Sequence, residues 1–302
     1  MIIVITGPTG VGKTKLSIEL AKKYDAEIIN GDAVQVYKGL NIGSAKVTEE
    51  EKEGIPHHLF DIKEVDEEYS IYDYQKDCRH LIEDITKRGK NVIIVGGTGL
   101  YIKSALYDYT LTENNNISNQ YEDISTEDLY QKLITLDKDI NIDKFNRRRV
   151  VRALNYYLEN GKSINENKNG NNLLYDAIFI GLTMDNREKL YDRINDRVDK
   201  MVENGLIQEV KAFYDKNIHT KPLLSAIGYK ELYLYFDGTI SYEDAIDLIK
   251  RNSRRYAKRQ YTFFNHQFNV NWFNVNINNF NETICEVVKY INEKKKDYIS
   301  RI

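Results

Sequence analysis

The chain has 302 residues, of which 41% are hydrophobic and 29% are charged, so it can bury the core of one large domain or of a domain with a smaller one attached. No run of about 18 apolar residues occurs, and the N-terminal strand enters a glycine-rich loop, unlike a secretion signal. Cys78 and Cys285 form no metal or disulfide pattern, which suits a reducing compartment. We therefore expect a cytoplasmic protein, and a monomer.

The formal net charge of −3 argues against nucleic-acid binding by the chain as a whole, but the charges are unevenly distributed. Segments 147–152 (RRRVVR) and 250–260 (KRNSRRYAKRQ) contain arginine and lysine without any acidic residue. A solvated helix face usually intersperses acids, so their absence favours contact with a polyanion at one place on the protein.

The predicted elements begin as an alternation of strands and helices. In chain order we expect a strand at 2–6, a helix at 13–24, a strand at 26–30, a helix over 69–89 with Ser70 as its N-cap, and a strand from 91 that ends in a glycine turn. This order predicts parallel strands covered by helices, with ligands at the carboxyl ends of the strands. The loops at those ends are 7–14, 31–38 and 96–101.

The composition changes after Leu111. Polar, asparagine-rich stretches at 112–125 and 165–172 flank helical patterns at 126–137 and 146–160. The core pattern resumes with a strand at 175–184, several helices and a late strand at 270–273, and the last residues resemble a frayed basic helix end. We predict an α/β fold, a P-loop NTPase-like parallel sheet flanked by helices. Its core comprises 1–110 and 173–302, and 111–172 form a small, mostly helical insertion domain.

The first loop matches the phosphate-binding pattern G-x-x-x-x-G-K-[ST], placed after a strand and before a helix. Its backbone N–H groups would cradle a diphosphate, the lysine would reach the phosphates, and the threonine hydroxyl would bind Mg²⁺. The residues predicted to bind diphosphate here are Gly7, Pro8, Thr9, Gly10, Val11, Gly12, Lys13 and Thr14.

The rest of the chain does not fit a common ATPase or GTPase. Neither an N-K-x-D nor a D-x-x-G motif is present, and the strand from 91 ends in Gly96-Gly97, where an ATPase would carry a magnesium-binding aspartate. A small-molecule kinase remains an alternative, because such enzymes share the loop.

The second loop carries an acid and an amide. Asp32 follows a strand and faces the phosphate loop in this topology, where a carboxylate could bind Mg²⁺, accept a proton or cap a helix. Gln35 can both donate and accept hydrogen bonds, as reading an adenine edge requires.

The chain resembles the bacterial tRNA dimethylallyltransferases, also called tRNA isopentenyltransferases, over nearly its whole length. The resemblance rests on GPTGVGKT, DAVQVYKGLNIGSAK, PHHLFDI, VIIVGGTGLYI, RVVRALNYYLENGKS, RINDRVDKMVENGLIQEV, LLSAIGYKEL and RRYAKRQ. It implies that the first loop holds the diphosphate of dimethylallyl diphosphate, and that the dimethylallyl group goes to N6 of adenosine 37 in tRNAs that read codons beginning with U.

The resemblance also assigns roles to individual residues. Asp32 would accept the proton of the N6 amine, while Lys13, Arg197 and a Mg²⁺ ion on Thr14 would stabilise the leaving diphosphate, with Arg193 as a weaker diphosphate contact. The alternative for the two arginines is a solvated pair that bridges Asp192 and Asp196. The residues implied to contact the tRNA anticodon stem-loop are Asp32, Ala33, Val34, Gln35, Thr98, Arg148, Arg149 and Arg152.

Four departures from the family pattern fall mostly on the RNA-facing side. Ala33 stands where a serine is usual, and the insertion is shorter and more polar than in the family. DKFN at 143–146 replaces a His-Pro-Asn-Asp turn, and YTFFNHQ at 261–267 replaces Thr-Trp-Phe-Arg. We therefore expect any difference in activity to appear in tRNA recognition. A tRNA-binding protein that has lost catalysis is the remaining alternative. The pair His57-His58 is interpreted as local packing, because adjacent histidines point in different directions.

Overall fold

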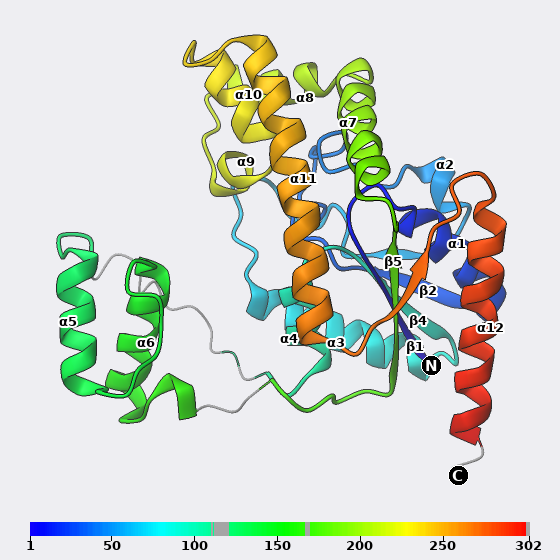
Figure 1. Cartoon of the computed structure of the whole chain (residues 1–302), viewed down its shortest axis with the longest axis horizontal. Helices are drawn as coiled ribbons and strands as arrows, with labels where there is room; N and C mark the ends of the chain where they lie inside the picture. Colours follow the sequence, from blue (N-terminus) through cyan, green and yellow to red (C-terminus); the bar gives the residue numbers. More distant parts are fainter. Residues whose placement is uncertain (110, 112–120, 167–169, 300–302) are drawn as a thin grey trace. The chain divides into compact units, whose positions relative to one another are not determined.

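In the computed structural model, which describes residues 1–109, 111, 121–166 and 170–299, six strands form one parallel sheet (Figure 1). They are β1 (Ile2–Thr6), β2 (Ala26–Asn30), β3 (His57–His58), β4 (Asn91–Val95), β5 (Ala177–Thr183) and β6 (Asn271–Asn274). The spatial order is β3-β2-β4-β1-β5-β6, and every neighbouring pair is parallel. The loops that follow β1, β2, β4 and β5 therefore gather at one edge of the sheet.

Helices cover both faces of the sheet. The helices of the core are α1 (Lys13–Tyr24), α2 (Glu49–Lys52), α3 (Ile71–Lys87), α4 (Gly99–Leu106), α7 (Arg187–Glu203), α8 (Leu206–Tyr214), α9 (Lys221–Ser225), α10 (Tyr229–Phe236), α11 (Tyr242–Gln267) and α12 (Phe280–Ile299). Helices α1 and α12 contact each other and the sheet, whereas α3 contacts β2 and β4 and packs on α4, which in turn contacts α11. Helices α7 to α10 lie beyond the carboxyl edge of the sheet, and α11 runs from them back alongside the sheet to α4 (Figure 1).

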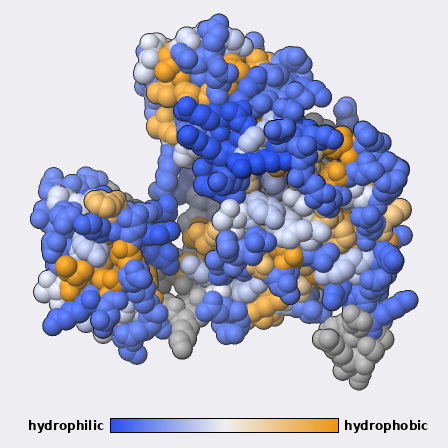
Figure 2. All heavy atoms as spheres, in the orientation of Figure 1, coloured by the Kyte–Doolittle hydropathy of each residue, from blue (hydrophilic) through white to orange (hydrophobic). Residues whose placement is uncertain are grey.

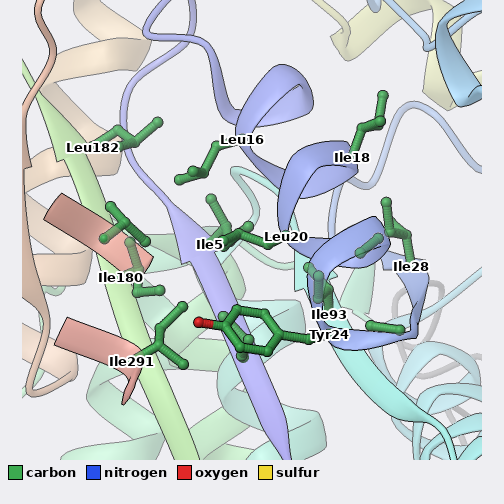
Figure 3. Packing of buried hydrophobic residues seen from close by; sticks show 14 of the residues in the cluster. Ile5, Leu16, Ile18, Leu20, Tyr24, Ile28, Ile93, Ile180, Leu182 and Ile291 are labelled. Atoms are coloured by element: carbon green, nitrogen blue, oxygen red, sulfur yellow. The ribbon is translucent and has the colours of Figure 1, made fainter. Parts of the chain in front are cut away.

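Alternating residues of the strands build the core between the sheet, α1 and α12. Ile5 of β1 packs with Leu16 and Leu20 of α1, and Ile180 of β5 lies near Ile291 of α12 (Figure 3). All five side chains are fully buried, and burial of each contributes roughly 1.5–3 kcal/mol. This packing fixes α1 on the sheet, and with it the loop that joins β1 to α1.

Most of the predicted elements are confirmed. The helix at 13–24 has the predicted bounds, and Ser70 caps α3 with a capping box completed by Asp73. The α/β fold class and the parallel order of the strands are also confirmed. The predicted frayed end falls partly outside the described residues, because 300–302 are not described.

Residues Tyr107–Leu173 form a second compact unit. The change in sequence composition predicted an insertion domain at 111–172, within this unit. It contains α5 (Thr126–Leu136), α6 (Arg147–Asn160) and the short 3-10 helix η2 (Ile164–Glu166), and its own core includes Leu129, Leu133, Val150 and Leu154. The predicted polar stretches lie partly outside the described residues, at 112–120 and 167–169.

Among the described residues, no helix has both the length and the apolar composition needed to cross a bilayer.

Candidate active site

The phosphate loop joins β1 to α1, and its backbone is tightly constrained. Gly7 has a φ of +135°, and a Cβ atom there would lie 2.3 Å from the backbone oxygen of Leu182 in β5. Only glycine fits this position. The Lys13 ammonium folds over the loop and donates hydrogen bonds to the backbone oxygens of Gly7 at 2.9 Å and Pro8 at 2.7 Å. The lysine is thus held at the loop where an anion would sit.

A cavity of about 660 Å³ lies at the carboxyl edge of the sheet, a size typical of small-ligand sites. It brings together the loops after β1, β2 and β4 with the inner faces of α7 and α11. Its lining includes Thr9, Gly10, Gly12, Lys13, Thr14, Asp32, Val34, Gln35, Gly96, Gly97, Arg193, Arg197, Tyr256 and Gln260. The cavity therefore brings five of the eight predicted diphosphate residues together with Asp32, Val34 and Gln35 of the loop after β2. Its lining does not include Gly7, Pro8 or Val11 of the phosphate loop, nor Ala33 or Thr98.

Asp32 faces this cavity from the end of β2. Its Oδ1 accepts the backbone N–H of Val34 at 2.9 Å, and its own N–H donates to Asn30 Oδ1 at 2.9 Å. Burial raises the pKa of the Asp32 carboxyl, while the Val34 N–H and the Lys13 ammonium act in the opposite direction. A carboxylate with a raised pKa is a stronger base than an exposed aspartate. Asp32 therefore stabilises a local turn and can also accept a proton.

Two arginines, Arg193 and Arg197, line the cavity together with Lys13. Arg193 Nε donates to the backbone oxygen of Gly10 at 3.1 Å, so this side chain lies against the loop and does not take the solvated alternative. Burial lowers the pKa of Arg197 from its usual value, and Asp32 opposes that effect. Burial, reinforced by Arg197, lowers the pKa of Lys13 to about 7. The site concentrates positive charge where an anionic ligand would neutralise it.

The loops after β2 and β4 meet across the cavity wall. A Cβ atom on Gly96 would lie 2.2 Å from the backbone of Gly31, so the two loops pass in direct contact.

The Gln35 amide donates to the backbone oxygens of Ser44 at 3.0 Å and Ala45 at 3.3 Å. Its N–H donors therefore hold a loop of the protein, and the predicted contact of Gln35 with an adenine edge stays a prediction.

Sequence reasoning missed Gln260 of α11 as part of this site. Its side chain is buried, with Oε1 accepting the Thr9 N–H at 3.2 Å and Nε2 donating to the Gly97 backbone oxygen at 3.2 Å. One amide thus connects the phosphate loop to the loop after β4. The Thr9 N–H already donates to Gln260, so this backbone group helps to fix the conformation of the phosphate loop.

Tyr256 lies one turn before Gln260 on α11 and was also missed. Burial raises the pKa of its hydroxyl to about 12, and the hydroxyl interacts with Thr98 and Gln260. No local sequence signal distinguishes Tyr256 from the many other tyrosines. Its position follows only from the packing of α11 on the sheet.

The basic face of α11 is confirmed as a surface feature. Arg251, Arg255, Lys258 and Arg259 are exposed, whereas Arg254 donates to Asn195 of α7. Figure 2 shows deep blue, the colour of the most hydrophilic residues, over the part of the surface that α11 and α7 form. This face adjoins the cavity, because Arg259 also lines it.

The basic helix of the second unit divides into structural and exposed arginines. Arg147 donates to the backbone oxygens of Ile124 and Tyr121 and holds the start of α6. Arg148, Arg149 and Arg152 are exposed on α6. Their proposed contact with RNA stays a prediction.

The residues present are compatible with Mg²⁺ but do not form a metal cage. No cluster of three or more His, Cys, Asp or Glu side chains suited to a metal occurs in the described part of the chain. His58 Nε2 pairs with Glu27, and His57 Nδ1 with the Ile55 backbone oxygen, while His57 also lines the cavity. Thr14 and Asp32 both line the cavity, and Mg²⁺ commonly takes one or two protein oxygens plus phosphate oxygens and waters.

The glycine-rich loop between a parallel strand and a helix, with cations converging on it, defines an α/β protein of the P-loop type. The model of the IPP transferase family matches residues 35–267. A tRNA dimethylallyltransferase from Anoxybacillus flavithermus is 50% identical over 301 residues, 97% of this chain and 96% of the relative. One from Bacillus subtilis is 49% identical over 285 residues, 91% of this chain and 90% of the relative.

Solved structures agree with these relatives. A tRNA delta(2)-isopentenylpyrophosphate transferase from Staphylococcus epidermidis matches with a TM-score of 0.73 and 43% identity, covering 97% of this chain and 99% of that chain. A eukaryotic dimethylallyltransferase acting on tRNA matches with a TM-score of 0.86 and 32% identity, covering 99% of this chain and 79% of that chain. The chain belongs to the IPP transferase family.

Proposed function

We propose that this chain transfers the dimethylallyl group of dimethylallyl diphosphate to N6 of adenosine 37 in tRNAs that read codons beginning with U, releasing diphosphate. The observation that carries the proposal is the cavity itself, which places the phosphate loop and Arg197 together with the basic carboxylate of Asp32. A diphosphate leaving group and an amine that must lose a proton need those two environments side by side.

In the proposed reaction the C–N bond to N6 forms as the C–O bond to the diphosphate breaks. The departing oxygen gains negative charge, which the loop N–H groups, Lys13 and Arg197 stabilise. The N6 proton passes to Asp32, whose raised pKa makes it a better acceptor than an exposed carboxylate. The products are N6-isopentenyladenosine, diphosphate and a protonated Asp32.

A Mg²⁺ ion is part of the proposal. When bound, it would neutralise charge on the diphosphate oxygens and so help the leaving group depart. Thr14 is the protein residue expected to hold it, because its hydroxyl stands at the start of α1 on the cavity wall.

The tRNA is proposed to bind by its anticodon stem-loop, with adenosine 37 flipped out of its stack. The acceptor loop from Asp32 to Gln35 and Thr98 would receive the base. The exposed arginines of α6 and the basic face of α11 would hold phosphates, which position the RNA and make its affinity salt-dependent. We expect the enzyme to act as a monomer in the cytoplasm.

The direct test mixes purified protein with unmodified tRNA that carries A36-A37-A38, dimethylallyl diphosphate and Mg²⁺. We expect the mass of the tRNA to rise by one five-carbon unit with stoichiometric release of diphosphate, and the gain to disappear in Asp32→Ala. Stoichiometric ADP formation from ATP and a small acceptor would instead support the kinase alternative. Tight tRNA binding without transfer would support the loss of catalysis.

The departures from the family pattern make a further expectation testable in the same assay. Ala33 and the altered blocks at 143–146 and 261–267 should affect the Michaelis constant for tRNA rather than that for the prenyl donor. An elevated constant for the donor alone would contradict this expectation.

A further inference from the structure

The carboxylate of Glu209, which does not line the cavity, holds the segment 41–45 that forms part of the cavity wall. Oε2 of Glu209, on α8, accepts the backbone N–H groups of Asn41 at 3.1 Å and Ile42 at 2.8 Å, and its Oε1 accepts that of Gly43 at 3.1 Å. Consecutive N–H groups that converge in this way form an anion-binding concavity. Here the anion is the protein's own side chain.

Tyr229 fixes the orientation of that carboxylate. The fully buried phenol, at the start of α10, donates its O–H to Glu209 Oε1. The same ring lies against Gly43, where a Cβ atom would be 2.4 Å from the ring. Carboxylate, phenol and loop therefore form one packed unit that connects α8 and α10 to the loop after β2.

The other side of the loop is held by a residue of the predicted acceptor site. The Gln35 amide donates to the backbone oxygens of Ser44 and Ala45, directly after the N–H groups that Glu209 accepts. Gly43, Ser44 and Ala45 all line the cavity. The segment 41–45 is thus fastened at its N–H groups by Glu209 and at its carbonyl groups by Gln35, so a shift of one contact moves the other.

We propose that Glu209 and Tyr229 are positioning residues for the acceptor base: they set the loop 41–45 and, through it, the orientation of Gln35. This inference rests on the proposed function. Neither side chain needs to touch a substrate. Loss of the clamp should therefore impair use of tRNA, whereas the phosphate loop, which makes none of these contacts, should keep its affinity for the prenyl donor.

The test measures steady-state constants for both substrates in Glu209→Gln. The amide keeps the size of the side chain but turns an NH₂ group toward backbone N–H donors. We expect kcat/KM for tRNA to fall by about tenfold or more, since charge-assisted hydrogen bonds are lost, with the KM for dimethylallyl diphosphate within about twofold of the wild type. Tyr229→Phe keeps the ring against Gly43. It should also lower kcat/KM for tRNA without changing the KM for dimethylallyl diphosphate, but by a smaller factor.

Glu203→Gln is the matched control, since it changes an exposed glutamate at the end of α7. It should leave both constants unchanged. If Glu209→Gln does not fold, Tyr229→Phe decides the outcome. A double-mutant cycle between Glu209→Gln and Gln35→Met should be non-additive in kcat/KM for tRNA, because both side chains hold one segment.

If the two residues had a merely structural role, the variants would have a lower melting temperature, and the constants for tRNA and for dimethylallyl diphosphate would be unchanged or changed equally. The double-mutant cycle with Gln35→Met would then be additive. Either result would overturn the inference. Failure of the proposed function is distinguishable, because the wild-type protein would then transfer no dimethylallyl group.

Discussion

The backbone N–H of Ala33 donates to the Thr98 hydroxyl at 3.0 Å, and the Thr98 N–H donates back to the Gly31 backbone oxygen at 3.0 Å. These reciprocal bonds join the loop after β2 to the loop after β4 on either side of Asp32. Alanine in place of the family's usual serine at position 33 leaves this contact intact, because the donor is the backbone N–H. Thr98 therefore holds the loop that carries Asp32, in addition to the RNA contact that the family resemblance implies.

Removal of the Thr98 hydroxyl should reduce turnover. In Thr98→Val the Ala33 N–H loses its acceptor and the Tyr256 hydroxyl loses a partner at nearly constant side-chain volume, and we expect kcat to fall by about tenfold, because hydrogen bonds near the reacting group are lost. Thr98→Ser keeps the hydroxyl and should stay within about threefold of the wild type. Equal activity of the two variants would contradict the role given to the hydroxyl.

The Lys13 ammonium should make diphosphate binding pH-dependent. Its pKa in the free protein is lowered to about 7, and a bound diphosphate favours the charged form and raises that pKa. Above pH 7 the free lysine is largely neutral, so binding must take up a proton and the affinity for diphosphate should fall as the pH rises. Below pH 7 the lysine is already charged, and this dependence should fade.

Calorimetry of pyrophosphate binding at pH 8, in buffers of different ionisation enthalpy, counts the protons taken up. Lys13→Arg is the control for protonation of pyrophosphate itself, since a guanidinium stays charged. Equal proton uptake by both proteins would show that Lys13 does not titrate.

Gln260 should matter for both substrates, in contrast to Glu209. Gln260→Met keeps the volume but leaves the Thr9 N–H and the Gly97 oxygen without this partner, so we expect kcat/KM to fall by about tenfold or more for each substrate. Gln260→Glu retains an acceptor for Thr9 but places a carboxylate near the diphosphate loop, and should raise the KM for the prenyl donor further. Steady-state kinetics of both variants are the measurement. Constants within twofold of the wild type would show that the connection Gln260 makes between the phosphate loop and the loop after β4 does not matter for catalysis.

The exposed arginines of α6 should contribute to tRNA affinity through phosphate contacts. Each of Arg148→Gln, Arg149→Gln and Arg152→Gln should weaken tRNA binding and reduce the slope of log affinity against log salt by about 0.7–0.9 per lost contact. Lys132→Gln, at an exposed site on α5, serves as the control. Unchanged slopes in all three arginine variants would show that α6 does not contact the RNA backbone.

The ion pairs of the buried Glu27 carboxylate should contribute to stability in a defined pH window. Glu27 is 3% exposed and pairs with Arg88 and His58, and the hydrogen bonds from Arg88 lower its pKa to about 2. A depressed folded-state pKa means that the stabilisation is present above the unfolded value near 4.5 and is lost as the pH falls toward 2.

Glu27→Gln should therefore cost about 1–3 kcal/mol at pH 7, a value reduced by the exposure of Arg88, and progressively less below pH 4.5. Denaturant unfolding across this range is the measurement. A difference that stays constant down to pH 2 would contradict the pairing.

The elements that could be predicted from the sequence are those with local signals. Hydrophobic periodicity and the Ser70 cap set α3, and the pattern from Gly7 to Thr14 set the phosphate loop, because both depend on neighbours in the chain. The approach of Asp32 to that loop followed from the rule that parallel strands end at one edge of a sheet.

The residues that the sequence could not reveal act across long separations. Gln260 bonds to Gly97 over 163 positions, and Glu209 bonds to Asn41 over 168. No periodicity or short motif encodes which glutamate or glutamine meets a distant backbone group, since this depends on how α8 and α11 pack. For the same reason the sequence did not show that the donors of Gln35 are used inside the protein.

The most direct test of the proposed reaction locates the added group on the tRNA. Wild-type protein and Asp32→Asn are each incubated with dimethylallyl diphosphate, Mg²⁺ and tRNA that carries adenosine or guanosine at position 37, and the digested nucleosides are analysed by mass spectrometry. We expect N6-isopentenyladenosine only with the wild-type protein and adenosine 37. Transfer of the same group to guanosine 37, or undiminished transfer by Asp32→Asn, would contradict this expectation.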